Sequence, residues 1–245
     1  MVMIYGFLYV PLIILIIYSF NNSPLGIWDH FTFKWYEKLL GNRDLLVATR
    51  NSLLLAVTSA TLATAIGTLG AVGLFRFRFK GKNFIYTLLY IVMMSPDVVM
   101  GMSFMVFFMT IKLPMGFFTL LILHITFCLP FVMITLFARL ADFDKHIVEA
   151  SKDLGADELS TFRYVILPML LPAIASGWLL SFTISMDDAI ASPFVNGSEF
   201  QILPLWIYSM VRVGLTPEIN ALCTIVFVIS LIIVTFSQLI LRKKP

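Results

Sequence analysis

Apolar residues along this chain gather into long runs that are separated by short polar segments. A helix needs roughly 20 apolar residues to cross about 30 Å of hydrocarbon. Runs near this length centre on residues 4–20, 51–75, 84–109, 117–138, 171–192 and 219–241. The pattern predicts an all-α integral membrane protein with about six transmembrane helices. We expect residues 1–245 to form a single transmembrane domain.

Composition supports this class. Hydrophobic residues make up 60% of the 245 residues and charged residues only 13%, which leaves too little polar surface for a water-soluble globule of this size. The run at 4–20 has no basic segment before it, and no small-x-small cleavage site follows it. It is therefore expected to be a retained helix and not a secretory signal.

Basic residues are distributed unequally between the two sets of connections. One side holds eleven: Arg76, Arg78, Lys80, Lys82, Arg139, Lys145, Lys152, Arg163, Arg242, Lys243 and Lys244. The other side holds six: Lys34, Lys38, Arg43, Arg50, Lys112 and Arg212. Because cytoplasmic connections carry the excess of Lys and Arg, both termini are predicted to be cytoplasmic. Anchoring to lipid headgroups is a sufficient explanation of the basic patch itself.

Two of the apolar runs carry features of helix geometry. The run at 84–109 contains Met94-Ser95-Pro96-Asp97 near its middle. Proline lacks a backbone donor and frees carbonyls that must find partners away from lipid, so a broken helix is predicted there. In the run at 51–75, Ala63, Gly67 and Ala71 recur at every fourth position and predict close approach of another helix.

Two adjacent acids, Asp187 and Asp188, lie within the run at 171–192. An aspartate at the centre of a membrane helix costs about 2.5 to 3.5 kcal/mol, so such residues are expected to face a bundle interior or a wet cavity. Asp188 shares one helical stripe with small and polar residues: Gly177, Ser181, Ser185 and Ser192. Asp188 is therefore favoured over Asp187 as the acid that faces a cavity. The alternative is that either acid lies near the outer water interface.

Asp97, Asp187 and Asp188 are together interpreted as counter-charges for a polycation that crosses the bilayer, and a polyamine fits this chemistry. Ser185 lies on the same polar stripe. Aromatic side chains that could contact the methylene segments of such a substrate are Tyr86 and Tyr90, at helical spacing from Asp97, and Trp178. Core packing is the alternative role for each aromatic residue.

Two other functions are possible for membrane-embedded acids. An intramembrane aspartyl protease would use Asp97 and Asp188 as a shared-proton dyad, but their Ser-Pro-Asp and Met-Asp-Asp contexts differ from the motifs of those enzymes. A secondary transporter would use the acids as a proton relay, but inverted repeats are not evident.

The sequence lacks metal-site spacing and a nucleotide-binding loop. The three histidines and two cysteines lack zinc-site spacing, so no metal is assigned. No phosphate-binding Gly-x-x-x-x-Gly-Lys-Ser/Thr loop occurs, and this chain is not expected to hydrolyse ATP or to bind a cofactor.

The segment from Asp142 to Pro172 reads DFDKHIVEASKDLGADELSTFRYVILPMLLP and predicts two short helices. Asp144 can cap the first, and Gly155 can end it in a left-handed conformation. Asp157 can cap the second, which Pro168 is predicted to end. A DNA-binding helix-turn-helix has a similar outline, but a loop tied to membrane helices at both ends is poorly placed to enter a major groove, so no nucleic-acid partner is expected.

Residue identities in this segment resemble the EAA loop of ABC importer permeases. The similar positions are Glu149-Ala150, Gly155 six residues after the glutamate, and Leu167-Pro168, while Ser151 replaces a common alanine. The resemblance implies a type I permease bundle whose loop at about 142–170 supplies a coupling helix to a partner ATPase. The implied coupling residues are Glu149, Ala150, Ser151, Asp153, Leu154 and Gly155.

Four longer stretches are similar to permeases of polyamine ABC importers, and the resemblance covers nearly the whole chain. They are MMSPDVVM at 93–100, HITFCLPFV at 124–132, SFTISMDDAI at 181–190 and ILPLWIYSMVRVG at 202–214. The resemblance implies a non-catalytic permease of the bacterial cytoplasmic (inner) membrane. Its implied partners are membrane lipid, a second permease chain, an ATPase homodimer that binds ATP and Mg, and a polyamine-binding protein at the outer face. The alternative is a permease for another small cationic or organic solute.

Overall fold

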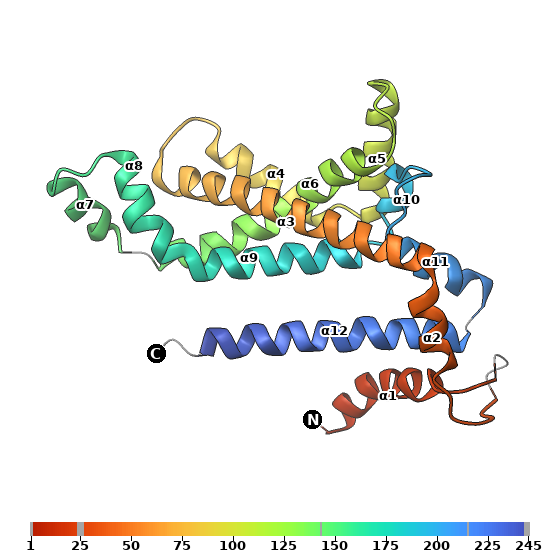
Figure 1. Ribbon diagram of the computed structural model, residues 1–245. Coiled ribbons are helices and arrows are strands. Elements are labelled where there is room, and N and C mark those ends of the chain that lie inside the picture. Colours follow the sequence, from red (N-terminus) through yellow and green to blue (C-terminus); the bar gives the residue numbers. More distant parts are fainter. Residues whose placement is uncertain (1, 24–26, 143, 215, 243–245) are drawn as a thin grey trace. The chain divides into compact units, whose positions relative to one another are not determined.

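The computed structural model describes residues 2–23, 27–142, 144–214 and 216–242, and helices dominate these segments (Figure 1). The helices are α1 (Val2–Tyr18), α2 (Lys34–Gly41), α3 (Arg43–Arg76), α4 (Lys82–Met94), α5 (Asp97–Thr110), α6 (Phe117–Ala141), α7 (Lys145–Asp153), α8 (Glu158–Thr161), the π-helical turn η1 (Phe162–Ile166), α9 (Leu167–Asp187), α10 (Ser192–Val195), α11 (Leu203–Val213) and α12 (Pro217–Arg242). The predicted all-α class is confirmed.

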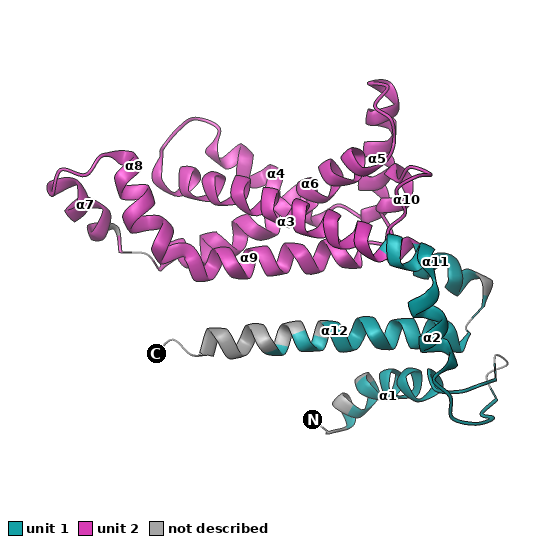
Figure 2. Cartoon of the chain, in the orientation of Figure 1, with its two compact units in different colours: residues 1–48, 206–245 teal, residues 49–205 magenta. Residues whose placement is uncertain are grey.

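The helices form two compact units, drawn in different colours in Figure 2. The first combines the described parts of residues 1–48 and 206–245. In it, α12 packs against both α1 and α2. The ammonium of Lys38 on α2 lies 2.6 Å from the carboxylate of the nearly buried Glu218 on α12, which joins the two helices. Trp35 donates its indole N–H to the carbonyl of Asn21 at 2.8 Å and fixes α2 to the end of α1.

The second unit, residues 49–205, is built around the pair α6 and α9, which pack along each other. Val132 of α6 lies between two helices at positions without a side chain. A Cβ atom on Gly67 of α3 would come within 2.8 Å of Val132, and one on Gly177 of α9 within 3.4 Å. Ala63 and Ala71 of α3 are fully buried. The small residues of α3 therefore mark a close helix contact, as predicted.

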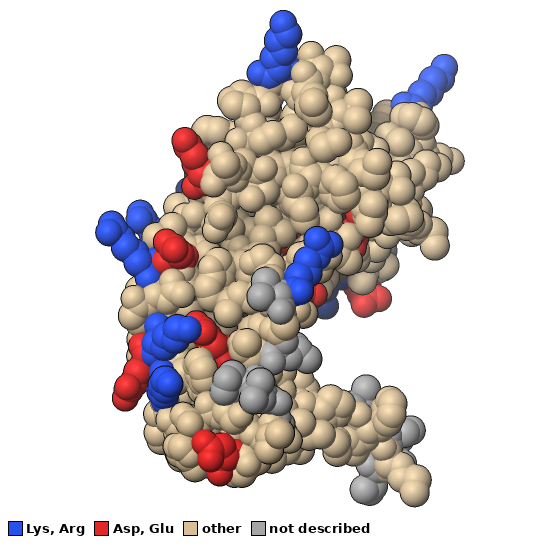
Figure 3. Space-filling model, turned by 90° about the vertical axis from the view of Figure 1, so that its right-hand side faces the viewer, with Lys and Arg blue, Asp and Glu red and all other residues tan. Residues whose placement is uncertain are grey.

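Three described helices are long and apolar enough to cross a membrane: α3, α6 and the continuous helix over Glu158–Asp187. The bent pair of α4 and α5 would add a fourth span. Within the described residues the apolar parts of α1 and α12 are shorter, so the count of six stays a prediction. Figure 3 shows a broad area of one face without charged side chains, as expected for a surface against lipid.

The predicted break in the run at 84–109 is confirmed. Helix α4 ends at Met94 and α5 begins at Asp97, with a bend of 109° between them. Pro96 takes the N-cap position of α5 in an extended conformation, which a continuous α-helix does not allow. The bend also overturns one prediction, because Tyr86 and Tyr90 lie on α4 and hold no helical spacing to Asp97 across it.

The segment after α6 forms the two helices predicted for it. The carboxylate of Asp144 accepts the N–H of His146 at 2.9 Å and caps α7. Gly155 follows α7 with φ of 84°, a conformation that favours glycine. Asp157 accepts the N–H of Ser160 at 2.7 Å and caps α8. Hydrogen bonds from Ser160 lower the pKa of Asp157, so the cap acts as a carboxylate at neutral pH.

The prediction that Pro168 ends the second helix is wrong. The π-helical turn η1 carries α8 directly into α9, and Pro168 falls in the first turn of α9. Proline is tolerated inside this continuous helix because the preceding π-helical turn accommodates the hydrogen bond that its missing N–H cannot make. The segment from Glu158 is therefore continuous with the membrane helix.

Ion pairs connect this segment to the end of α3. Glu158 lies in contact with the guanidinium of Arg76 on α3 and 2.9 Å from the ammonium of Lys152 on α7. The connection after Arg76 therefore lies at the same end of the second unit as α7 and α8. This agrees with the prediction that these two connections lie on the same side of the membrane. Lys243 and Lys244, which belong to the same predicted side, lie outside the described residues.

Candidate functional site

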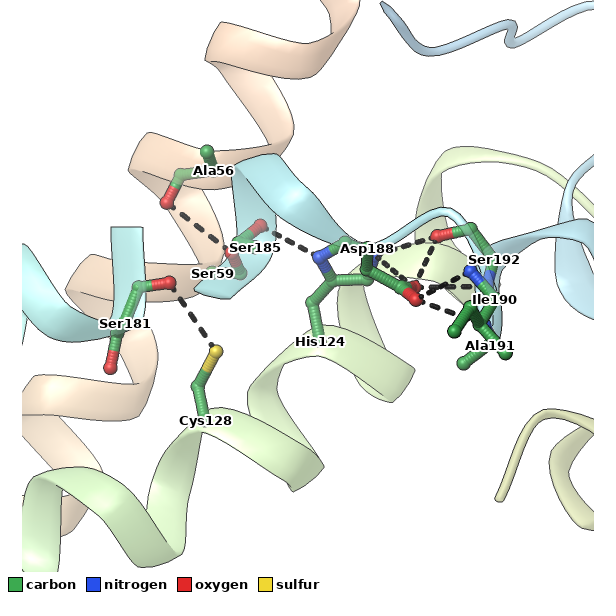
Figure 4. A network of polar contacts seen from close by, with 10 residues as sticks. All are labelled: Ala56, Ser59, His124, Cys128, Ser181, Ser185, Asp188, Ile190, Ala191 and Ser192. Atoms are coloured by element: carbon green, nitrogen blue, oxygen red, sulfur yellow. Dashed lines mark hydrogen bonds and ion pairs between the residues drawn. The ribbon is translucent and has the colours of Figure 1, made fainter. Parts of the chain in front are cut away.

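The two adjacent aspartates occupy different environments. Helix α9 ends at Asp187, so the helical stripe predicted to run on to Ser192 is wrong at its last two positions. Beyond the helix, the Asp188 carboxylate turns back on the chain (Figure 4). One oxygen accepts the N–H groups of Ile190 and Ala191, at 3.1 and 2.9 Å. The other accepts both the N–H of Ser192, at 2.9 Å, and its hydroxyl, at 2.6 Å.

His124 of α6 lies beside this turn and is completely buried. Its Nδ1 is 2.7 Å from the hydroxyl of Ser185, in the last turn of α9. Its Nε2 is 3.1 Å from the hydroxyl of Ser192 and 3.6 Å from the Asp188 carboxylate. Ser59 of α3 donates to Ser185 at 3.1 Å. The network thus links α3, α6, α9 and α10 (Figure 4).

The remainder of the polar stripe also faces protein. Ser181 is fully buried, and its carbonyl accepts the thiol of Cys128 on α6 at 3.5 Å. Gly177 abuts Val132 of the same helix. The stripe therefore lies against α6 inside the second unit, because small side chains let the two helices approach closely.

Asp187 and Asp97 contrast with Asp188 in being exposed. Among the interactions of the described residues, neither carboxylate has a hydrogen bond or an ion pair. A close contact relates the two segments that carry them: a Cβ on Gly101, one turn after Asp97, would lie 2.8 Å from the carbonyl oxygen of Ala191. Helix α5 therefore packs directly on the junction that follows α9.

The predicted aromatic residues are distributed between surface and interior. Tyr90 is 58% exposed on α4. Trp178 is half-buried and donates its indole N–H to the hydroxyl of Thr61 at 3.1 Å, which ties α9 to α3. Tyr86 packs on Phe137 with ring centroids 5.2 Å apart. Of these residues, Tyr90 is the most exposed, and Trp178 and Tyr86 hold helices together.

The predicted coupling residues share a surface at the end of the second unit. Glu149, Ala150, Asp153, Leu154 and Gly155 are all exposed. Ser151 differs, because its hydroxyl is buried 3.0 Å from that of Thr161 and ties α7 to the end of α8. Leu154 is 89% exposed.

Sequence reasoning missed the role of His124, which it considered only as a zinc ligand. The signal was present, since an ionisable residue inside a membrane run is expected to have a specific partner. Across the described residues, no group of three or more His, Cys, Asp and Glu side chains could hold a metal ion.

Comparison with known proteins identifies the family. Residues 47–244 match the family model described as "Binding-protein-dependent transport system inner membrane component". The chain is 56% identical to the spermidine/putrescine transport system permease protein PotC of Escherichia coli (strain K12), over 100% of this chain and 93% of that protein. It is 40% identical to the putrescine transport system permease protein PotI of the same strain, over 91% of this chain and 82% of that protein.

Solved structures support the same fold. A bacterial ABC transporter involved in the import of the acidic polysaccharide alginate contains a chain that matches 99% of this chain and 92% of its own length, with a TM-score of 0.74 and 16% identity. A chain of an amino acid ABC transporter matches 87% of this chain and 100% of its own length, with a TM-score of 0.65 and 18% identity. The chain therefore belongs to the family of binding-protein-dependent transport system inner membrane components, the membrane-spanning permease subunits of ABC importers, and is a transport subunit and not an enzyme.

Proposed function

We propose that this permease imports polyamines such as spermidine and putrescine. The observation that carries the proposal is the 56% identity, over the full chain, to a permease named for these two substrates. The chemistry of the site supports it. A polycation leaving water needs negative counter-charges, and Asp97 and Asp187 are exposed acids with no partner among the described residues.

We assign Asp97 and Asp187 to direct contact with the ammonium groups of the substrate, and Tyr90 to contact with a methylene segment or a cation. Asp188, Ser185 and Trp178 belong to the same predicted path. Their hydrogen bonds to neighbouring helices favour a role in supporting its wall. The assignment differs from the expectation that favoured Asp188, because its carboxylate already accepts four hydrogen bonds.

We further propose that the chain works with a second permease subunit, an ATPase homodimer that binds ATP and Mg, and a polyamine-binding protein at the outer face. The exposed Leu154 and Leu159 support docking of the ATPase at α7 and α8. Burying one such leucine contributes about 1.5 to 3 kcal/mol. The ion pairs of Glu158 with Arg76 and Lys152 would pass movement of this surface to α3.

The proposed topology has six spans within one transmembrane domain and both termini in the cytoplasm. A reporter that is active only in the cytoplasm, fused after Pro245, is expected to be active. Activity of a periplasm-specific reporter at the same position would refute this arrangement.

The substrate is tested by uptake of radiolabelled spermidine and putrescine into cells with equal membrane levels of each variant. Asp187→Asn and Asp97→Asn remove a charge at nearly constant size, so uptake should fall while insertion is unchanged or improved. Asp44→Asn is the matched control, an exposed acid in the first turn of α3. Wild-type uptake in both path variants would refute the assigned contacts. Absence of polyamine uptake by the wild type, assembled with its partner subunits, would favour another small cationic or organic solute.

A further inference from the structure

The buried His124 bridges the last turn of α9 and the first residue of α10, which lie on either side of the junction that follows α9. Its Nδ1 contacts Ser185, three residues before Asp188, and its Nε2 contacts Ser192, four residues after it. The junction bends back on the Asp188 carboxylate, but those hydrogen bonds are all local. His124 of α6 therefore connects this local turn to the neighbouring membrane helix, and the hydroxyl of Thr119 on the same helix lies 2.8 Å from the carbonyl of Val195 at the end of α10.

One placement of protons satisfies both ring nitrogens of His124. Ser192 donates its hydroxyl proton to Asp188, so its oxygen accepts a proton from His124, which must then carry it on Nε2. The unprotonated Nδ1 accepts from Ser185. The hydroxyl of Ser59 lies 3.1 Å from the Ser185 oxygen and 3.3 Å from the carbonyl of Ala56, and it shares its one proton between them. A neutral imidazole therefore uses both nitrogens, each in a different role. Leucine, which has a similar apolar body, could supply neither role.

The junction also presents the exposed acid. Asp187 is the last residue of α9, directly before the turn that Asp188 closes. On the far side of the turn, Ala191 and Phe194 pack against Gly101 of α5, the helix that begins at Asp97. A shift of the junction would move Asp187 and change the contact with α5 at the same time.

We propose that His124 is a positioning residue for transport. It holds the Asp188–Ser192 junction and thereby keeps the exposed Asp187 at a fixed position relative to α5. This inference rests on the proposed function for its transport consequence. The hydrogen bonds of His124 to Ser185 and Ser192, here named the clamp, do not depend on the proposed function. The clamp and the proposed function can therefore fail separately.

The test uses four variants of the permease, assembled with its partner subunits in lipid nanodiscs and proteoliposomes. His124→Leu removes both nitrogens and keeps an apolar residue on α6. His124→Gln places an amide near Nε2 and can restore the contact with Ser192, and His124→Asn places one near Nδ1 and can restore only that with Ser185. Thr126→Val is the matched control on α6, because within the described parts of the chain the Thr126 hydroxyl bonds only its own helix at Ile122.

Two readouts separate positioning from bulk stability. Hydrogen exchange of the Ile190, Ala191 and Ser192 amides reports on the clamp, since all three donate to Asp188. The apparent KM for spermidine reports on the placement of Asp187. We expect His124→Leu to speed exchange of these amides and to raise the KM by at least about fivefold, the effect of losing one buried hydrogen bond. His124→Gln should reverse much of both changes. His124→Asn, which lacks the contact with Ser192, should resemble His124→Leu, and Thr126→Val should resemble the wild type.

Unchanged exchange in His124→Leu would overturn the clamp. Faster exchange with a wild-type KM would overturn the positioning role, as would equal KM values for His124→Gln and His124→Leu. A wild-type complex that transports no polyamine would refute the proposed function, and the exchange data would still decide whether His124 holds the junction.

Discussion

The contact between α5 and the junction after α9 can be tested by adding one methyl group. In Gly101→Ala the new Cβ would lie 2.6 Å from a ring carbon of Phe194 and 2.8 Å from the carbonyl oxygen of Ala191. The ring can rotate aside, but the carbonyl moves only if the junction moves. Inserting a methyl group into such a packed contact costs about 1 to 3 kcal/mol.

The helix propensity of alanine opposes this cost, because Gly→Ala inside a helix gains about 0.5 to 1 kcal/mol. Gly73→Ala on α3 removes this term from the comparison, since nothing lies within 4 Å of its Cβ position. The difference between the two variants is therefore the packing cost alone. It corresponds to a Tm for Gly101→Ala at least about 2 °C below that of Gly73→Ala.

Thermal unfolding of the assembled complex in detergent measures this difference, with uptake by equal amounts of each variant as a second readout. Uptake by Gly101→Ala should fall, because displacing the junction moves Asp187, the residue directly before it, and uptake by Gly73→Ala should match the wild type. Equal Tm values for the two variants would refute the close approach of α5 to Ala191.

Three further changes test other parts of the chain. Gly155→Val places a β-branched residue at φ of 84°, with open space around it, so the backbone is strained by about 1 to 2 kcal/mol. This strain should weaken ATPase binding while membrane insertion stays normal. Co-purification of the ATPase together with normal uptake would contradict this. Glu158→Gln removes the ion pairs with Arg76 and Lys152 and should lower polyamine-stimulated ATPase activity more than ATPase binding. Equal loss of both would point to docking alone. Ser52→Ala leaves the buried N–H of Leu203 without its 2.7 Å acceptor and should lower stability by about 1 to 3 kcal/mol in thermal unfolding, and an unchanged Tm would argue against that bond.

The features that the sequence predicted well depend on near neighbours in the chain. The break before Asp97 follows from the missing N–H of Pro96 and its steric demand on the preceding residue. The caps at Asp144 and Asp157 are bonds to backbone groups two or three residues away. The left-handed end after α7 needs only the freedom of Gly155. Such features are local, so a single stretch of residues determines them.

The candidate site depends on where distant segments meet, and there the sequence was insufficient. A helical stripe through Asp188 assumed that α9 continues, whereas the chain leaves the helix after Asp187 and the Asp188 carboxylate is used to close the turn. The partner that anchors this turn, His124, is more than 60 residues away in sequence, on another helix. Spacing along one helix distinguishes Asp187 from Asp188 only by the direction in which each side chain leaves the helix axis. Which acid remains available to a ligand is decided by the hydrogen bonds that the packed helices offer, and these exist only in the tertiary structure.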